Sequence, residues 1–101
     1  RLLQMAAFIR PKIPETHELL GEIYLKRKQI KLAEFHLKRA VEIKPDYALS
    51  MRNLGIIYYF HLKKPEEAAA YFSRALSIDP NQKQADNIRI LIKKIRKQKR
   101  R

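Results

Sequence analysis

The chain has 101 residues, enough for one small domain, and 33% of them are charged. It contains no cysteine, which excludes a disulfide framework and a cysteine-ligated zinc site, and no apolar run approaches the roughly 18 residues that span a bilayer. The formal net charge is +13, which leaves anionic partners open. Because a reducing compartment is compatible with the absence of cysteine, we predict a cytoplasmic location.

Hydrophobic periodicity predicts helices throughout the chain. Residues 1–10 have a basic start and an apolar middle, a pattern that signal peptides share, but no small-residue cleavage stretch follows and residue 1 is arginine. We therefore interpret them as the end of a helix cut from a longer protein. The helices that we expect after it cover residues 14–28, 30–44, 46–62, 65–78 and 81–99.

The predicted helices repeat with a period of about 34 residues. Pro11, Pro45 and Pro80 are 34 and 35 residues apart, and Gly21 and Gly55 are 34 residues apart. Each glycine follows a leucine and is followed by a tyrosine three residues later, and alanines recur at fixed distances before each proline. The longer spacing reflects one extra residue, which we expect near residues 63–65. The pattern is typical of a helical repeat array.

This frame resembles the tetratricopeptide repeat, in which Leu-Gly and Tyr mark the first helix, and Ala, a large residue, Ala and Pro mark the second. The resemblance implies an all-α fold, an alpha-alpha superhelix in which antiparallel helix pairs form a right-handed solenoid. We assign residues 14–46 to a first repeat and residues 47–81 to a second. Residues 1–11 would be the second helix of a preceding partial repeat, and residues 82–101 a C-terminal capping helix with a basic tail.

Glycine inside a helix costs about 1 kcal/mol relative to alanine, so the recurrence of Gly21 and Gly55 implies close contact between paired helices. We expect each glycine to lie opposite a small alanine side chain. The alanines that supply these partners are Ala33, Ala40, Ala68 and Ala75. The bulkier Leu37 and Phe72 would fill the space between them.

In proteins of this resemblance, the first helix of each pair lines a concave surface that grips extended or helical peptides. On this chain the corresponding face has an acidic half in the first repeat and an aromatic and basic half in the second. The candidate groove residues are Glu18, Glu22, Arg52, Ile56, Tyr59, Phe60 and Asn87. Two alternatives stay open, namely that the glutamates form a solvated face and that Tyr59 and Phe60 pack under the next helix.

Some chaperone-binding repeats of this family hold a C-terminal carboxylate with lysine, arginine and asparagine side chains. Asn53 stands at one such asparagine position. Glu18 and Glu22 stand at the lysine and asparagine positions of the first repeat, where they would repel a carboxylate. Gln84 and Ile88 stand at the basic positions of the following helix. The resemblance therefore does not imply a carboxylate clamp.

Catalysis has little support in the residue pattern. The histidines lack metal-ligand spacing, and neither a Ser-His-acid pattern nor a glycine-rich phosphate loop is present. His17 stands at a position that is usually aromatic and packed, so we expect a structural role, whereas His36 and His61 are expected at the surface or in loops. We predict that the chain is not an enzyme and holds no metal or cofactor.

Basic side chains concentrate at the C-terminal end, where residues 89–101 carry 8 basic and no acidic side chains. The basic patch comprises Lys93, Lys94, Arg96, Lys97, Lys99, Arg100 and Arg101. Three interpretations stay open. The patch solubilises the terminal helix, it contacts an acidic protein or an anionic membrane surface, or it binds nucleic-acid phosphates with a steep salt dependence.

These patterns favour a non-catalytic protein–protein interaction scaffold that binds a peptide or partner helix in the concave groove of a tetratricopeptide repeat array. The alternative is electrostatic binding of nucleic acid or of an anionic surface through the basic C-terminal helix. Uncapped repeat ends would also allow self-association, with Leu2, Leu3 and Phe8 on such a face.

Overall fold

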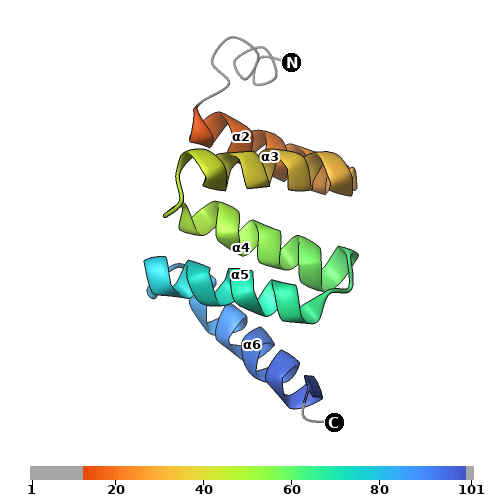
Figure 1. Cartoon of the computed structure of the whole chain (residues 1–101), viewed down its shortest axis with the longest axis vertical. Helices are drawn as coiled ribbons and strands as arrows, with labels where there is room; N and C mark the ends of the chain where they lie inside the picture. The colour runs from red at the N-terminus through yellow and green to blue at the C-terminus, as the bar shows by residue number, and fades with distance from the viewer. Residues whose placement is uncertain (1–12, 100–101) are drawn as a thin grey trace.

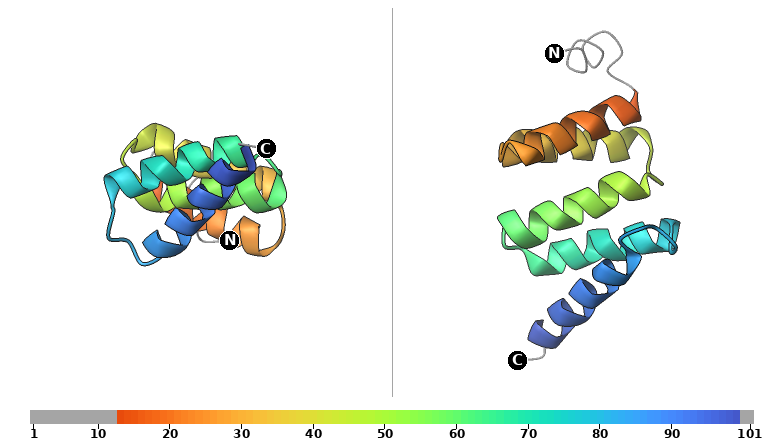
Figure 2. Two further views of the ribbon diagram at one scale, coloured as in Figure 1. Left: turned by 90° about the horizontal axis from the view of Figure 1, so that it is seen from below. Right: turned by 180° about the vertical axis from the view of Figure 1, so that it is seen from behind.

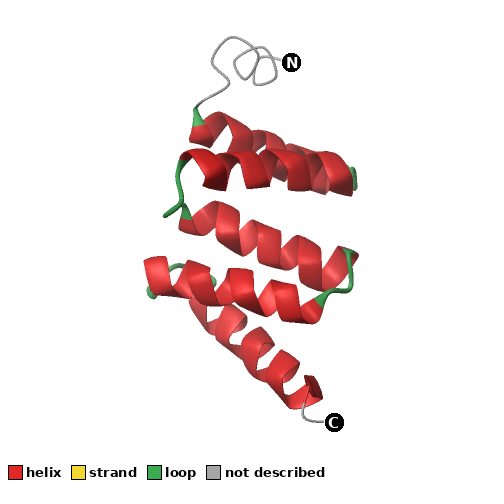
Figure 3. Ribbon diagram, viewed as in Figure 1, coloured by secondary structure: helices red, strands yellow, loops and turns green. Residues whose placement is uncertain are grey.

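The computed structural model describes residues 13–99, which form helices joined by short turns, with no strand among them (Figure 3). The elements are α2 (Pro14–Lys26), α3 (Ile30–Ile43), α4 (Ala48–Ile56), the π-helix η1 (Ile57–His61), α5 (Pro65–Ile78) and α6 (Ala85–Lys99). The helix predicted for residues 1–10 lies outside the described residues.

The helices stack in antiparallel pairs, α2 with α3 and α4 with α5, and α6 crosses the last pair at an angle (Figure 1). Seen from behind, the helices again follow one another along the stack in the order of the chain (Figure 2). Each pair contacts only its neighbours, as expected of a repeat architecture. The predicted all-α stack of antiparallel helix pairs is therefore confirmed.

Proline opens one helix in each repeat. Pro14 begins α2 and Pro65 begins α5, because the first helical turn needs no backbone N–H from these residues. Acidic side chains follow at once, Glu15 in α2 and both Glu66 and Glu67 in α5, where the positive end of the helix dipole favours them. These local signals explain why the starts of α2 and α5 agree with the prediction.

The two glycines lie where paired helices touch, but their neighbours differ from the prediction. A Cβ atom at Gly21 would stand 2.5 Å from Leu37 Cγ, and one at Gly55 would stand 2.5 Å from Phe72 Cδ1. The expectation that each glycine faces an alanine is therefore wrong. A large side chain from the second helix fills the space that the missing Cβ leaves, and this increases the apolar contact between the helices.

A polar cluster joins the first repeat to the second. The Tyr58 hydroxyl of η1 donates to Glu34 of α3, and Lys38 Nζ lies 3.0 Å from Glu34 Oε2. Burial alone would raise the pKa of Glu34, but the hydrogen bonds from Tyr58 and Lys38 outweigh it and lower the pKa. Since Tyr58 is also buried in the core, this cluster fixes the second pair relative to the first.

The turn after the first helix of each repeat contains a lysine in the left-handed region, Lys28 at φ 60° and Lys63 at φ 57°. In the first repeat Gln29 N donates to Tyr24 O at 2.9 Å, which is the six-residue loop of a Schellman motif. In the second repeat the corresponding bond, from Lys64 N to Tyr58 O, spans one more residue.

That extra residue changes the helix itself. Leu62 N donates to Ile57 O at 2.9 Å, five residues back, so the helix widens into the π-helix η1. We expected a continuous α-helix over residues 46–62, with the insertion near residues 63–65. Instead α-helical geometry ends at Ile56, and the insertion is absorbed before the turn.

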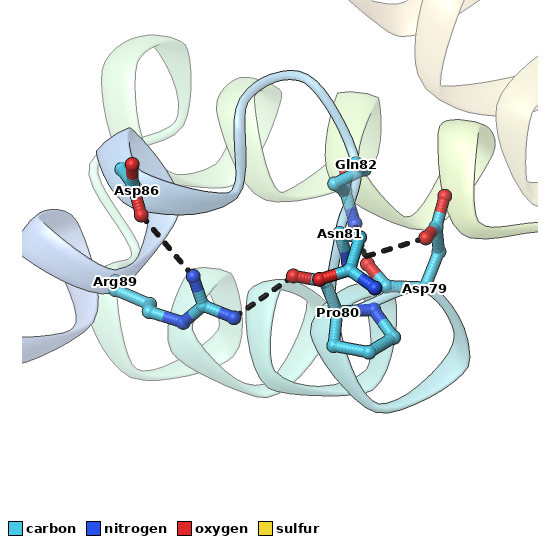
Figure 4. A network of polar contacts seen from close by, with 6 residues as sticks. All are labelled: Asp79, Pro80, Asn81, Gln82, Asp86 and Arg89. Atoms are coloured by element: carbon cyan, nitrogen blue, oxygen red, sulfur yellow. Dashed lines mark hydrogen bonds and ion pairs between the residues drawn. The ribbon is translucent and has the colours of Figure 1, made fainter.

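The C-terminal helix begins later than predicted, at Ala85 rather than at Asn81. The backbone N–H of Asn81 donates to Asp79 Oδ1 at 3.3 Å within a turn (Figure 4). The Gln82 side chain donates to Ala75 O at 3.1 Å, a carbonyl that also accepts from Asp79 N, and to Asp79 O at 3.0 Å. These contacts hold residues 79–84 as a turn between α5 and α6.

Helix α6 packs one stripe against α5 and leaves the opposite side in water. Its buried residues are Ala85, Ile88, Ile92 and Ile95. Ile90 stands 35 residues after Gly55, yet it is 62% exposed. If a further helix packed on α6 as α5 packs on α4, it would meet the Ile90 side chain at the position where both repeats have glycine. The outer face of α6 therefore suits a capping helix.

Candidate functional site

A cavity of about 400 Å³ lies between the first helix of the second repeat and the C-terminal helix. We call it the α4–α6 groove. It is lined by Arg52, Ile56, Phe60, Phe72, Gln84, Asn87, Ile88 and Leu91. The groove therefore combines four of the seven predicted groove residues with side chains that α5 and α6 supply.

The groove has apolar walls and three polar groups. Asn87 Nδ2 of α6 donates at 3.0 Å to Gln84 Oε1 in the preceding turn, so these two amides orient each other. Arg52 differs, because its Nε is buried and has no hydrogen-bond partner among residues 13–99. A buried N–H without a hydrogen-bond partner costs free energy. The groove thus offers one positively charged side chain beside an apolar surface.

The π-helix supplies the aromatic wall of the groove. Phe60 is 48% exposed, so it does not pack under the next helix as the alternative interpretation proposed. Tyr59 is half-buried against the core, and the two rings meet edge to face with centroids 4.8 Å apart. Both rings also line a neighbouring hollow of about 350 Å³, together with Lys63, Pro65 and Gln98. Phe60 therefore forms a wall of both hollows.

The two predicted acidic residues do not line the α4–α6 groove. Glu18 is only 1% exposed, and Asn53 Nδ2 donates to its Oε1 at 3.3 Å. Burial, followed by a hydrogen bond to Glu22 and the charge of Glu22, raises the pKa of Glu18 to about 8, while Arg52 opposes the shift. Glu18 is therefore a buried carboxyl with a raised pKa, and it is not part of a solvated face.

Asn87 is a candidate groove residue that the sequence analysis placed on the C-terminal helix. Ile88 and Leu91 of α6 line the groove as well, and Gln84 joins them from the turn that precedes α6. Phe72, which was expected to fill the space between helices, also lines the groove. The apolar stripe of α6 was visible in the sequence, but which edge of that stripe borders the groove depends on how α6 crosses α4 and α5.

The first repeat contains a histidine pair. His17 is buried, and its Nδ1 lies 3.0 Å from His36 Nδ1, with the rings stacked. Desolvation and the charge of His17 lower the pKa of His36. The prediction for His36 is therefore wrong, because it packs half-buried on α3 against Tyr24, whereas His61 is exposed. Among residues 13–99 no three His, Asp or Glu side chains form a metal site.

The basic patch divides between two surroundings. Lys93 and Arg96 line a hollow of about 320 Å³ between α5 and α6. Lys94, Lys97 and Lys99 are exposed on the same helix, while Arg100 and Arg101 lie outside the described residues, as do Leu2, Leu3 and Phe8. None of the helices within residues 13–99 is long and apolar enough to cross a membrane.

Known proteins resemble this chain in both sequence and fold. The uncharacterized protein ycf37 of Porphyra purpurea is 33% identical over 81 residues, covering 80% of this chain and 46% of that protein. Its counterpart in Pyropia yezoensis is 28% identical over 82 residues, covering 81% and 46%. The chain thus spans about half the length of these curated relatives.

Among solved structures, one described as the first TPR of Spaghetti (RPAP3) bound to the HSP90 peptide SRMEEVD is similar, with a TM-score of 0.84. It shares 23% sequence identity, and the match covers 98% of this chain and 75% of that one. This likeness shows the fold. A family model described as tetratricopeptide repeat matches residues 16–81, and such domains are commonly protein–protein interaction modules. The chain therefore belongs to the tetratricopeptide repeat family.

Proposed function

We propose that the α4–α6 groove binds a segment of a partner protein in which an acidic residue lies next to large apolar side chains. The observation that carries this proposal is the position of Arg52, which lines the groove beside apolar side chains and forms no ion pair within residues 13–99. A carboxylate in the groove would pair with the Arg52 guanidinium, which binds carboxylates in a fork geometry.

The walls of the groove determine the rest of the ligand. Ile56, Phe60 and Leu91 present apolar surface that is not covered by other residues of the described chain. A peptide side chain placed there removes apolar area from water, with about 25 cal/mol gained for each Å². The amides of Gln84 and Asn87 at the α6 side can bind the peptide backbone.

The raised pKa of Glu18 is compatible with an acidic ligand at Arg52. Arg52 lies close enough to Glu18 to oppose the rise in its pKa, yet the pKa of Glu18 stays raised. Arg52 therefore keeps much of its positive charge available for a ligand. Asn53 is committed to Glu18, so the anchor differs from the clamp of chaperone-binding repeats, in which asparagine holds the carboxylate.

Binding without catalysis is the activity that we propose for the chain, since domains of this family are typically non-catalytic scaffolds. A cytoplasmic location stays a prediction, as does self-association through the repeat ends. The relatives are about twice as long as the chain, so the partner of the whole protein is proposed only as a class.

A random-peptide display library selected against the 101-residue chain tests the proposal. The selected peptides should contain an acidic residue beside large apolar ones. In fluorescence anisotropy, Arg52→Gln should weaken their binding at least about tenfold, as expected of a central charged contact. Asn87→Glu, at an exposed groove position, should also weaken binding, because it repels the acidic residue.

The matched control is Arg74→Gln, which removes the same charge from an exposed position on α5 outside the groove. It should change the affinity by less than about twofold. Equal affinities for the wild type, Arg52→Gln and Asn87→Glu would show that the peptides bind elsewhere. Titration of RNA and DNA between about 50 and 200 mM salt tests the electrostatic alternative, which requires a steep loss of affinity.

A further inference from the structure

A second hollow lies across α6 from the α4–α6 groove. We call it the α5–α6 hollow. It encloses about 320 Å³ and is lined by Ser73, Leu76, Arg89, Ile92, Lys93 and Arg96. At about 100° per residue, the three basic residues of α6 fall within about 60° of one another around the helix. Asn87 and Leu91 project to the other side, so the hollow and the groove are separate surfaces.

The hollow collects positive charge without a matching negative charge. Among residues 13–99 neither Lys93 nor Arg96 forms an ion pair. Arg89 pairs with Asp86, whose side chain is 96% exposed and therefore largely hydrated. Three cationic side chains thus share one small concave site with at most one partner carboxylate. Such a site attracts a compact anion more strongly than an isolated lysine does.

Arg89 is already held in place. Its Nη1 lies 3.2 Å from Asp86 Oδ1, and its Nη2 donates to Pro80 O at 2.8 Å (Figure 4). These bonds tie the guanidinium to the first turn of α6 and to the loop before it, so a ligand need not order this long side chain. Preorganisation of this kind lowers the entropic cost of binding.

We propose that the α5–α6 hollow binds a phosphorylated serine or threonine of a protein segment, with Arg89, Lys93 and Arg96 around the phosphate. A phosphate monoester carries close to two negative charges at pH 7 and three strong acceptor oxygens, which suits three cationic donors. The Ser73 hydroxyl adds a fourth donor at the α5 side. Leu76 and Ile92 form an apolar floor for the residue beside the phosphate.

The floor and the shape favour a phosphorylated protein segment over two other phosphate sources. Single-stranded nucleic acid is usually held by aromatic side chains that stack on bases, and no aromatic residue lines this hollow. A bilayer would use the outer basic face of the helix, where Lys94 and Lys97 lie, rather than a recess between two helices. These other sources become arms of the experiment.

The experiment follows the amide and side-chain signals of the 101-residue chain by NMR. Inorganic phosphate is titrated first, and then a capped peptide with one phosphoserine between two leucines, beside its unphosphorylated counterpart. The expected shifts centre on Ser73, Arg89, Lys93 and Arg96, and the phosphopeptide should bind at least about tenfold more tightly than the serine peptide. The double variant K93Q/R96Q should lose at least about tenfold of that affinity.

The matched control is K94Q/K97Q, which removes the same charge at the same spacing from the same helix but outside the hollow. It should weaken the phosphopeptide by less than about threefold, through screened long-range attraction alone. All four positions are exposed, so both variants should fold, as circular dichroism will verify. Equal losses in the two variants would overturn the proposal.

Two further arms use single-stranded RNA and vesicles that contain an anionic phospholipid. The proposal would also be overturned if RNA or vesicles bind, K93Q/R96Q selectively weakens that binding, and the phosphopeptide does not bind. The hollow would then recognise another source of phosphate. Equal binding of the phosphorylated and unphosphorylated peptides would overturn it as well. None of these outcomes changes the prediction for Arg52, which lies on the other side of α6.

Discussion

The two repeats share one frame and use it differently. Each places a glycine under a large side chain of its second helix, and each turns at a left-handed lysine. The first repeat buries ionisable groups, whereas the second widens into a π-helix and exposes Phe60 beside a groove. Glu18 and Arg52 stand 34 residues apart at the same register, one buried with a raised pKa and the other bordering the groove. A few packing positions therefore fix the helix pairing and leave the rest of each repeat free to diverge.

The largest expected effect tests the feature that the repeats share. Gly55→Ala should lower the free energy of unfolding by about 3 kcal/mol and Gly21→Ala by about 1.5 kcal/mol, within the range for overpacked cores. A Cβ at Gly55 would meet three atoms of the stiff Phe72 ring within 3.0 Å, whereas Leu37 opposite Gly21 has more rotational freedom. Denaturant unfolding followed by circular dichroism measures both values.

A double variant verifies the cause. Gly55→Ala combined with Phe72→Leu should be less destabilised than the sum of the two single changes, because the smaller side chain leaves room for the new methyl group. Strictly additive losses, or a stabilising effect of either alanine, would show that glycine and the large side chain do not share one site.

Sequence periodicity predicted the frame well because the frame depends on local spacing. The prolines, the glycines and the Leu-Gly-Tyr pattern gave the helix pairs, and α5 was predicted with its observed bounds, residues 65–78. The partners of Gly21 and Gly55 were predicted wrongly, since small residues on facing helices do not have to meet. Which side chain enters the space beside a glycine depends on the crossing angle and the rotamer, and periodicity contains neither.

The sequence predicted the part of the groove that α4 and η1 supply, together with Asn87 on α6. Arg52, Ile56, Phe60 and Asn87 do line one groove, but Glu18 does not, because Asn53 from the next repeat and the surrounding core bury it. Burial of this kind arises from packing between elements 35 residues apart. The position of the inserted residue was also missed, since an insertion can lengthen either the turn or the helix, and the backbone hydrogen bonds decide between them.

The second prediction concerns the buried carboxyl that distinguishes the first repeat. Because the folded pKa of Glu18 is raised to about 8 from 4.5, the folded state binds the proton more tightly than the unfolded state. Stability should therefore fall as pH rises from about 4.5 to 8 and then level off. Glu18→Gln, which resembles the protonated form, should remove this fall and raise the free energy of unfolding at pH 9 by about 1–2 kcal/mol after allowance for solvent screening.

The matched control is Glu67→Gln, at an exposed position on α5. It should leave the pH dependence unchanged. If the wild type and Glu18→Gln show parallel stability curves between pH 5 and 9, the carboxyl titrates at an ordinary pKa, and the first repeat does not bury a neutral glutamate.

The third prediction concerns the histidine pair, and its pH dependence has the opposite sign. The folded pKa of His36 is lowered, so below the ordinary histidine value of about 6.5 the unfolded state binds more protons than the folded state. The free energy of unfolding should therefore decrease as the pH drops below about 6.5. The decrease should be less than about 1 kcal/mol, because His36 is partly hydrated. His36→Gln should flatten this acid limb, whereas His61→Gln, at an exposed position in the second repeat, should leave it unchanged. An identical acid limb in all three proteins would remove the histidine pair from the comparison.

The smallest expected effect converts the turn of the second repeat into that of the first. Deleting His61 restores the spacing in which the N–H after the left-handed lysine bonds five residues back, as Gln29 does to Tyr24. Because the π-helix and the Schellman turn satisfy similar numbers of backbone groups, the free energy of unfolding should change by less than about 1 kcal/mol. Affinity for peptides selected on the groove should fall by about two- to fivefold, since Phe60 would leave its widened segment of helix. A loss above about 2 kcal/mol would instead show that the π-helix supports the pairing of α4 with α5, and the extra residue would then belong to the frame rather than to the groove.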